Sequence, residues 1–156
     1  MKKINVKKKQ ILQRTGDLRS KVYQVESGLL RSYTIDENGK EHIFMFGPEG
    51  WIVSDYVSPE QPCDLFIDAL EDSVIIQFEK KENLDPSLEK LVNRIRVLQR
   101  RVIMLMSKSA IERYEHFVST YPNIIQRVPQ HMVASYLGIT PEALSAVKSQ
   151  RLKSDK

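Results

Sequence analysis

Residues 127–148 of this 156-residue chain read RVPQHMVASYLGITPEALSAVK, two short helix-like stretches that meet at Gly138. Pro129 and Pro141 each suit the first turn of a helix, where the missing N–H of proline costs nothing. Gly138 stands where a left-handed residue ends the first helix, and Thr140 can cap the second. Apolar residues on both sides of the turn are expected to face inward: Met132, Val133, Tyr136, Leu137, Ile139, Leu144 and Val147. The stretch therefore predicts either a plain helical hairpin or a helix-turn-helix that reads DNA.

The DNA-binding interpretation depends on the second helix, expected over residues 141–151. In a helix-turn-helix, the N-terminal residues of this helix lie against base edges in the major groove. Glu can accept from a cytosine amino group, Ser can serve either base, and Lys and Arg suit guanine or phosphate. The residues that we expect to contact DNA are Thr140, Pro141, Glu142, Ser145, Lys148, Ser149 and Arg151.

A heptad stripe precedes this stretch. Apolar residues alternate there in steps of three and four, with β-branched residues at a and leucine at d, a pattern that favours two parallel strands of a coiled coil. The predicted dimer interface is Leu88, Leu91, Ile95, Leu98, Val102 and Leu105. The same stripe can instead be the buried face of a helix that lies on the preceding β-rich region, and three further residues widen it: Val92, Ile103 and Met106. We expect the dimer from the heptad pattern, and it favours the DNA-binding interpretation, because two copies of the reading helix suit a two-fold symmetric DNA site.

Short β runs separated by turn signals occupy residues 11–78. Asn38-Gly39 lies between the runs LLRSYTI and KEHIFMF, and Asn-Gly between apolar runs is the strongest local hairpin signal. Strands at such close spacing predict an antiparallel barrel or roll. Trp51 is expected in the core or at its rim, and the run WIVSDYV around it is expected to be a strand.

These patterns predict an α+β chain in three parts: an effector-sensing antiparallel β roll at 1–85, a long dimerisation helix at 86–109, and a helix-turn-helix domain at 110–156. The boundary between the last two lies at Ser107-Lys108-Ser109, where the heptad stripe falters and a new helix begins. That helix ends at Tyr121, because proline at position 122 disfavours helix in the residue before it.

Charge is segregated along the chain, although the net charge is only +4. Residues 1–31 carry nine basic and two acidic side chains, residues 32–93 carry four and fourteen, and residues 94–109 carry five and none. Basic faces beside an acidic body can steer a molecule onto an anionic partner, but chance clustering on a solvated surface gives the same counts.

Several classes of function are disfavoured. No apolar run approaches the roughly 20 residues of a membrane span, and no leader opens the chain, so we expect a cytoplasmic protein without a membrane partner. Cys63 is the single cysteine and the three histidines are scattered, so we expect neither a disulfide framework nor a metal site. No nucleophile–base spacing or phosphate loop suggests an enzyme, and Asp55, Asp64 and Asp68 are interpreted as turn or surface residues.

Two stretches resemble a known family. RYEHFVSTYPNIIQRVPQHMVASYLGITPEALS is similar to the C-terminal part of bacterial Crp/Fnr-type transcription regulators, and KVYQVESGLLRSYTIDENGKEHIFMF resembles their cyclic-nucleotide-binding-like β roll. The resemblance runs from about Lys7 to Leu152, and VASYLGITPEALS is its most specific part. It implies a sensing β roll, a long dimerisation helix and a DNA-binding helix-turn-helix. The implied partners are double-stranded DNA, a second copy of the chain, an unknown small-molecule effector and, as a further candidate, RNA polymerase.

The resemblance fails at two sites. Relatives that bind cyclic AMP hold its sugar and phosphate with a Gly-Glu pair and an Arg-Ser or Arg-Thr pair, whereas this chain has Glu49-Gly50 and Cys63-Asp64. Asp64 would repel a phosphate at ~4 Å by about 1 to 4 kcal/mol. We therefore expect no cyclic AMP and identify no other cofactor. The iron–sulfur members' cysteine ligands are also absent.

The DNA-reading helix departs from the family as well. Glu142 and Ser145 match base-reading positions, but the next position, usually arginine, is Ala146, and Lys148 stands where many relatives carry arginine or an apolar residue. The sequence also ends before the β-hairpin wing that many relatives place after this helix. We predict a dimeric transcription regulator that recognises a palindromic operator. The alternative is a ligand-binding or protein-interaction module whose helix-turn-helix no longer binds DNA.

Overall fold

A computed structural model describes the backbone of residues 1–80 and 88–154, and the side chains of residues 1–80 and 92–151. The chain divides into two compact units, Met1–Leu84 and Asp85–Lys156. The first unit is built of strands and the second of helices, so the predicted sequence of an antiparallel β region followed by helices is confirmed.

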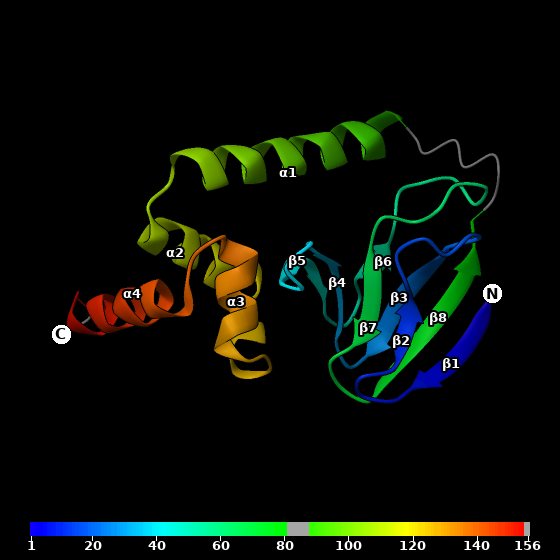
Figure 1. Cartoon of the computed structure of the whole chain (residues 1–156), viewed down its shortest axis with the longest axis horizontal. Coiled ribbons are helices and arrows are strands. Elements are labelled where there is room, and N and C mark those ends of the chain that lie inside the picture. The colour runs from blue at the N-terminus through cyan, green and yellow to red at the C-terminus, as the bar shows by residue number, and fades with distance from the viewer. Residues whose placement is uncertain (81–87, 155–156) are drawn as a thin grey trace. The chain divides into compact units, whose positions relative to one another are not determined.

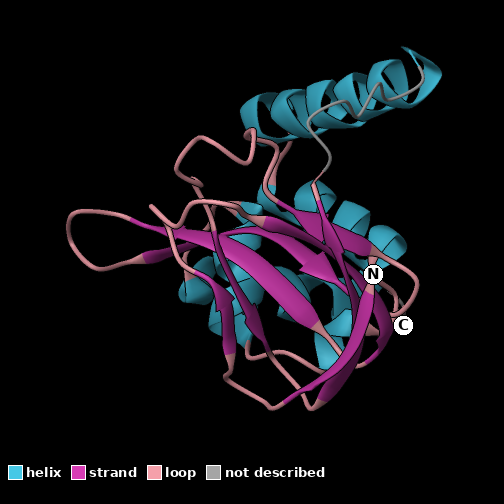
Figure 2. Cartoon of the chain, turned by 90° about the vertical axis from the view of Figure 1, so that its right-hand side faces the viewer, coloured by secondary structure: helices cyan, strands magenta, loops and turns pink. Residues whose placement is uncertain are grey.

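The first unit is a roll of two four-stranded antiparallel sheets (Figures 1 and 2). One sheet has the strand order β1-β8-β3-β6 and the other has the order β2-β7-β4-β5. The strands are β1 (Lys2–Val6), β2 (Ile11–Gln13), β3 (Lys21–Ser27), β4 (Leu30–Ile35), β5 (Glu41–Gly47), β6 (Ile52–Ser54), β7 (Phe66–Ala69) and β8 (Ser73–Glu79). Both sheets contribute to one apolar core, whose buried members include Val25, Leu30, Val53, Ile67 and Ile75.

The predicted hairpin at Asn38-Gly39 joins β4 to β5. The Asp36 amide donates to the carbonyl of Lys40 at 3.0 Å, and the Asp36 carboxylate accepts from the amides of Asn38 and Lys40. Gly39 has a φ of +78°, the left-handed conformation that a three-residue hairpin loop requires. A local turn signal therefore predicted the hairpin that pairs the edge strand β5 with β4.

Two expectations for the roll were wrong. The β region begins earlier than residue 11, because Lys2–Val6 forms an edge strand paired with β8. Ile4 and Val6 alternate with polar residues there, and lysines on an edge strand discourage further pairing. In addition, the run WIVSDYV forms only the short strand β6, because the chain leaves the sheet at the buried Asp55. Trp51 packs half-buried against the core, as expected.

Within residues 88–154, the described part of the second unit forms four α-helices and one short 3-10 helix: α1 (Leu88–Ser107), α2 (Ala110–Thr120), η1 (Ile124–Gln126), α3 (Gln130–Leu137) and α4 (Pro141–Ser154). The predicted break at Ser107-Lys108-Ser109 is present, because Ser109 caps α2 and forms a reciprocal capping box with Glu112. A buried cluster of Phe117, Tyr121 and Tyr136 packs α2 and its C-cap residue against α3, with ring centroids 5.4 to 5.6 Å apart.

Candidate functional site

The turn between α3 and α4 has the geometry that its residue types predict. Gly138 ends α3 in the left-handed conformation, with φ +65°. Its amide donates to the carbonyl of Ser135 at 3.1 Å, and the amide of Ile139 donates to Ala134 at 3.0 Å, which together form a Schellman motif. Thr140 Oγ1 accepts from the amide of Ala143 at 3.2 Å and so caps α4. A tight glycine turn thus joins the two helices α3 and α4 (Figure 1).

Burial separates α4 into two faces. Leu144 and Val147 are buried, as expected, together with Val133, Tyr136 and Leu137 of α3, whereas Met132 and Ile139 are half-buried. The exposed residues at the start and along the outer face are Thr140, Pro141, Glu142, Ser145, Ala146 and Ser149. Positions 142, 145, 146 and 149 follow the three-and-four spacing of one helical face. Most of the residues expected to contact DNA therefore share one solvent-exposed surface.

Two of the expected DNA-contacting residues are less exposed than the rest. Lys148 and Arg151 are half-buried, and the Arg151 guanidinium lies 5.8 Å from the centroid of the Tyr114 ring on α2. That both residues contact DNA stays a prediction. Long basic side chains can pack their stems on apolar surface while the charged end stays in solvent.

The electrostatics of this face are mixed. The second unit carries twelve basic and six acidic residues, a net charge of +6, whereas the first unit carries twelve and fourteen, a net charge of −2. Glu142 lies in the first turn of α4, and hydrogen bonds to its own amide and to Thr140 lower the pKa of its carboxyl. A carboxylate at a helix N-terminus is stabilised by the helix dipole. The exposed face of α4 therefore begins with a hydrogen-bond acceptor, the Glu142 carboxylate, although the helical unit as a whole is basic.

α1 exposes an apolar stripe. Val92, Ile95, Val102, Ile103 and Met106 are 44%, 55%, 54%, 51% and 81% exposed, and at 100° per residue they lie within about one third of the helix circumference. Of the predicted dimer interface, Ile95 and Val102 lie in this stripe, while Leu98 and Leu105 lie half-buried beside it. The side chains of Leu88 and Leu91 lie outside the described residues. An exposed stripe of this kind is typical of a surface that binds a partner.

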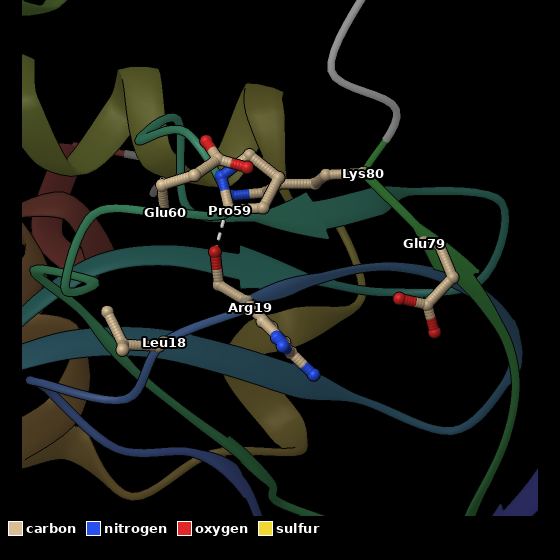
Figure 3. A pocket seen from close by; sticks show the side chains of 7 residues that line it. Leu18, Arg19, Pro59, Glu60, Glu79 and Lys80 are labelled. Atoms are coloured by element: carbon tan, nitrogen blue, oxygen red, sulfur yellow. Dashed lines mark hydrogen bonds between the residues drawn. The ribbon is translucent and has the colours of Figure 1, made fainter.

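The roll contains a pocket of about 560 Å³ (Figure 3). It lies between the β2–β3 loop, the loop after β6 and the end of β8, and its lining residues are Leu18, Arg19, Ser20, Pro59, Glu60, Glu79 and Lys80. The Lys80 ammonium donates to Ser20 Oγ at 2.7 Å and to the carbonyl of Val57 at 2.9 Å. Burial lowers the pKa of Lys80. Cations and carboxylates line this pocket together, an arrangement that suits a small polar molecule.

The residues at the expected phosphate-binding region do not fit a cyclic nucleotide phosphate. Cys63 is 1% exposed, and its thiol donates to the carbonyl of Arg14 at 2.8 Å, so it faces the protein interior. Asp64 is exposed and brings a negative charge. The Glu49 carboxylate already accepts from the amide of Gly28 at 3.1 Å. Neither Cys63 nor Asp64 can supply the cation that holds a phosphate in the cyclic-AMP-binding relatives.

Two of the three aspartates interpreted as turn or surface residues are buried. Asp55 is 2% exposed, and its carboxylate accepts from the amides of Val57, Asp64 and Leu65, which organises the loop after β6. Asp68 is 7% exposed and makes a bidentate pair with Arg31 at 2.8 and 3.0 Å. Each carboxylate therefore has structural partners: backbone amides for Asp55 and the Arg31 guanidinium for Asp68. Among the described residues, no group of three His, Cys, Asp or Glu side chains could hold a metal ion.

Comparison with known proteins identifies the lineage of this architecture. Residues 3–85, more than half of the chain, match the family model of the cyclic nucleotide-binding domain. The chain belongs to that family, in its Crp/Fnr branch. Its Crp/Fnr relatives include the anaerobic regulatory protein of Haemophilus influenzae, 27% identical over 164 residues, and the fumarate and nitrate reduction regulatory protein of Vibrio cholerae, 29% identical over 175 residues. The alignments cover 90% and 96% of this chain, but 63% and 68% of those relatives.

Solved Crp/Fnr structures share the fold. FixK2 from Bradyrhizobium japonicum matches with a TM-score of 0.78 at 20% identity, over 99% of this chain and 85% of that one. A transcriptional regulator of the CRP/FNR family from Thermus thermophilus matches with a TM-score of 0.71 at 18% identity, over 98% and 87% of the two chains. No helix in residues 88–154 combines the length and the apolar composition needed to cross a membrane.

The sequence prediction missed the polar contacts that organise this Crp/Fnr chain. Arg31 and Asp68 are 37 residues apart and meet because β4 and β7 are paired. Arg113 binds carbonyls 8 and 24 residues away. No local pattern marks such residues, because their partners are brought near only by the fold.

Proposed function

We propose that this chain forms a homodimer and acts as a transcription regulator that binds double-stranded DNA through α4. The observation that carries the proposal is the exposed face of α4, which begins directly after the glycine turn and presents Glu142, Ser145 and Ser149 to solvent. In a helix-turn-helix these are the positions that meet base edges in the major groove. The matched relatives are regulatory proteins, which supports the same function and makes an enzyme the less favoured alternative.

In this proposal, two copies of the chain associate through α1. Its exposed apolar stripe is wide enough to pack against a second copy, and a parallel pair would present two α4 helices about a two-fold axis. Half-sites read by such a pair are separated by about one turn of duplex, roughly 34 to 36 Å. A two-fold symmetric operator is therefore expected. Because its partner is DNA, we place the protein in the cytoplasm with the chromosome, and RNA polymerase remains a candidate partner.

The roll is proposed to sense an effector other than cyclic AMP. The buried Cys63 and the exposed Asp64 support that exclusion, and the pocket lined by Arg19 and Lys80 is the place where we expect a small polar ligand. A ligand regulates DNA binding only when it binds one conformation more tightly than the other. Mass spectrometry of the purified protein would identify a bound molecule, and adding that molecule should change the DNA affinity.

Selection from a random library of duplex DNA tests the DNA-binding function. The purified protein should recover a palindrome. Glu142→Ala should relax the preference at one base pair of each half-site, because it removes an acceptor for a cytosine amino group worth ~1–3 kcal/mol. Glu115→Ala is the matched control, since it removes an exposed carboxylate from α2. Recovery of no sequence by the parent protein at low salt would contradict the proposal.

A protein-interaction or ligand-binding module is the second candidate. Ala146 is exposed in the middle of the α4 face, where it offers neither a charge nor a hydrogen bond. The Glu142 carboxylate on the same face repels phosphates. A salt titration separates the two functions, because each phosphate contact makes log K fall with log salt by a slope of about 0.9. The module hypothesis requires that no DNA binding is measurable even at low salt.

A further inference from the structure

Arg113 on α2 binds three backbone carbonyls from three different segments. Its Nη2 donates to the carbonyl of Leu105 at 2.7 Å, its Nε donates to Lys108 at 3.0 Å, and its Nη1 donates to Leu137 at 3.1 Å. Leu105 lies in the last turn of α1, Lys108 lies in the connection to α2, and Leu137 is the last residue of α3. A single guanidinium therefore joins the end of α1 to the end of α3.

These carbonyls are chemically suited to a cation. The last four carbonyls of a helix have no partner within the helix, and they form the negative end of the helix dipole. At the end of α3, Gly138 and Ile139 satisfy the carbonyls of Ser135 and Ala134, and Arg113 supplies a donor to that of Leu137. Arginine has five N–H donors in a rigid planar fork, so it can hold several acceptors in one fixed arrangement.

A second contact joins the same two helices. The Arg101 guanidinium of α1 lies 4.2 Å from the centroid of the Tyr136 ring on α3. Tyr136 is 5% exposed and packs against the rings of α2, so its own ring is held in place. Leu105 and Arg113 also lie beside the turn, because a Cβ built on Gly138 would lie in van der Waals contact with both, 3.8 Å from Leu105 Cδ2 and 3.7 Å from Arg113 Nη1. The ends of α1 and α3 and the turn before α4 thus converge on Arg113.

We infer that Arg113 is a positioning residue that fixes the angle between α1 and the α3–α4 pair. The consequence for DNA binding depends on the proposed function. In a dimer held by α1, this angle would set the separation and orientation of the two α4 helices. Arg113 itself lies on α2, which lies between α1 and α3 in the chain. Its role is to transmit the geometry of α1 to α4.

The donor geometry of arginine predicts how replacements of Arg113 will differ in effect. A lysine at position 113 keeps the charge but has one compact ammonium on a flexible stem, and it cannot reproduce the planar fork. Arg113→Lys should therefore preserve the helical fold and lose part of the positioning, whereas Arg113→Ala should lose all of it. Arg100→Ala is the matched control, because it removes an exposed arginine from α1.

Distance measurements between two spin labels test the inference without DNA. Labels are placed at Val97→Cys on α1 and Ala146→Cys on α4, both exposed positions, in a Cys63→Ser background. Excess unlabelled protein confines the measurement to pairs within one chain. The parent and Arg100→Ala should each give one narrow distance distribution. Arg113→Ala should give a broad distribution or a second population, with Arg113→Lys between them, while circular dichroism shows unchanged helix content.

DNA binding then tests the consequence. Duplexes carry the selected palindrome at its own half-site spacing, or with one base pair added or removed. The parent should lose about tenfold or more in affinity on the altered spacings, and Arg113→Ala should lose much less while keeping its affinity for a single half-site. An unchanged narrow distance distribution in Arg113→Ala would overturn the inference. Failure of the parent to bind any DNA would overturn the proposed function and leave the distance result to decide the role of Arg113.

Discussion

In the roll, the buried charged groups Arg31 and Asp68 are paired with each other, whereas α1 of the helical unit exposes a stripe of apolar side chains. Arg31 and Asp68 are 6% and 7% exposed and bind each other in two places, with Glu41 also on the same guanidinium. On α1, Ile95 and Met106 are 55% and 81% exposed. The roll therefore satisfies the charges of Arg31 and Asp68 within itself, whereas the exposed stripe of α1 is typical of a surface that binds a partner.

The two units also differ in net charge. The roll has a net charge of −2 and the helical unit has a net charge of +6, although the whole chain has only +4. A basic unit joined to an acidic one in the same chain biases an anionic partner such as DNA toward the helices. Four changes test this comparison, beginning with the buried pair of the roll.

The largest effect is expected at Asp68. Asp68→Ala should lower the free energy of unfolding by about 3 to 5 kcal/mol, because it leaves the Arg31 charge buried without its main partner. Chemical denaturation measures the change. Asp64→Ala, at an exposed carboxylate nearby in sequence, should change stability by less than about 0.5 kcal/mol. Equal effects of the two variants would contradict the view that the roll depends on its buried charges.

The second effect concerns the apolar stripe of α1. Val102→Lys should weaken the dimer by more than about 100-fold, since burying each valine contributes ~1.5–3 kcal/mol and a dimer buries two. Val97→Lys is the matched control, because Val97 is 56% exposed but lies about 140° around the helix from Val102. Sedimentation equilibrium measures both. A parent protein that stays monomeric at micromolar concentration would remove the basis of the dimer proposal.

A smaller effect is expected from a charge added to the α4 face. Ala146→Arg should strengthen DNA binding and raise the slope of log K against log salt by about 0.9, the value of one new phosphate contact. The Val97→Lys variant adds a positive charge on α1 and should leave this slope unchanged. If both variants changed the slope equally, net charge and not the α4 face would govern binding.

The smallest effect is a pH dependence at the start of α2. Hydrogen bonds from Lys108 and Ser109 lower the pKa of Glu112 from 4.5 to about 2. Because the folded-state pKa lies below the unfolded one, the contribution of Glu112 is complete above pH 4.5 and is lost as the pH falls toward 2. Thermal unfolding of the parent and of Glu112→Gln over this range should converge at low pH. Parallel curves would show that the capping box does not titrate.

Local signals in the sequence determined the helical turn and the main hairpin. Gly138, Thr140 and Asn38-Gly39 act on backbone groups within a few residues, so their residue types alone predict the left-handed conformation, the cap and the loop. The periodicity of the α1 stripe also predicts which side chains lie on one face. These features needed no knowledge of the rest of the fold.

Only the tertiary structure decided which distant polar groups meet. Arg31 finds Asp68 through the pairing of β4 with β7, the edge strand β1 pairs with β8 from the far end of the roll sequence, and the pocket gathers residues from three separate loops and strand ends. Arg113 reaches Leu105 and Leu137 because the last turn of α1 and the end of α3 both lie beside α2. Periodicity and turn residues specify each element and its buried face, but partners across elements depend on register and packing angle, which are set when all the elements pack at once.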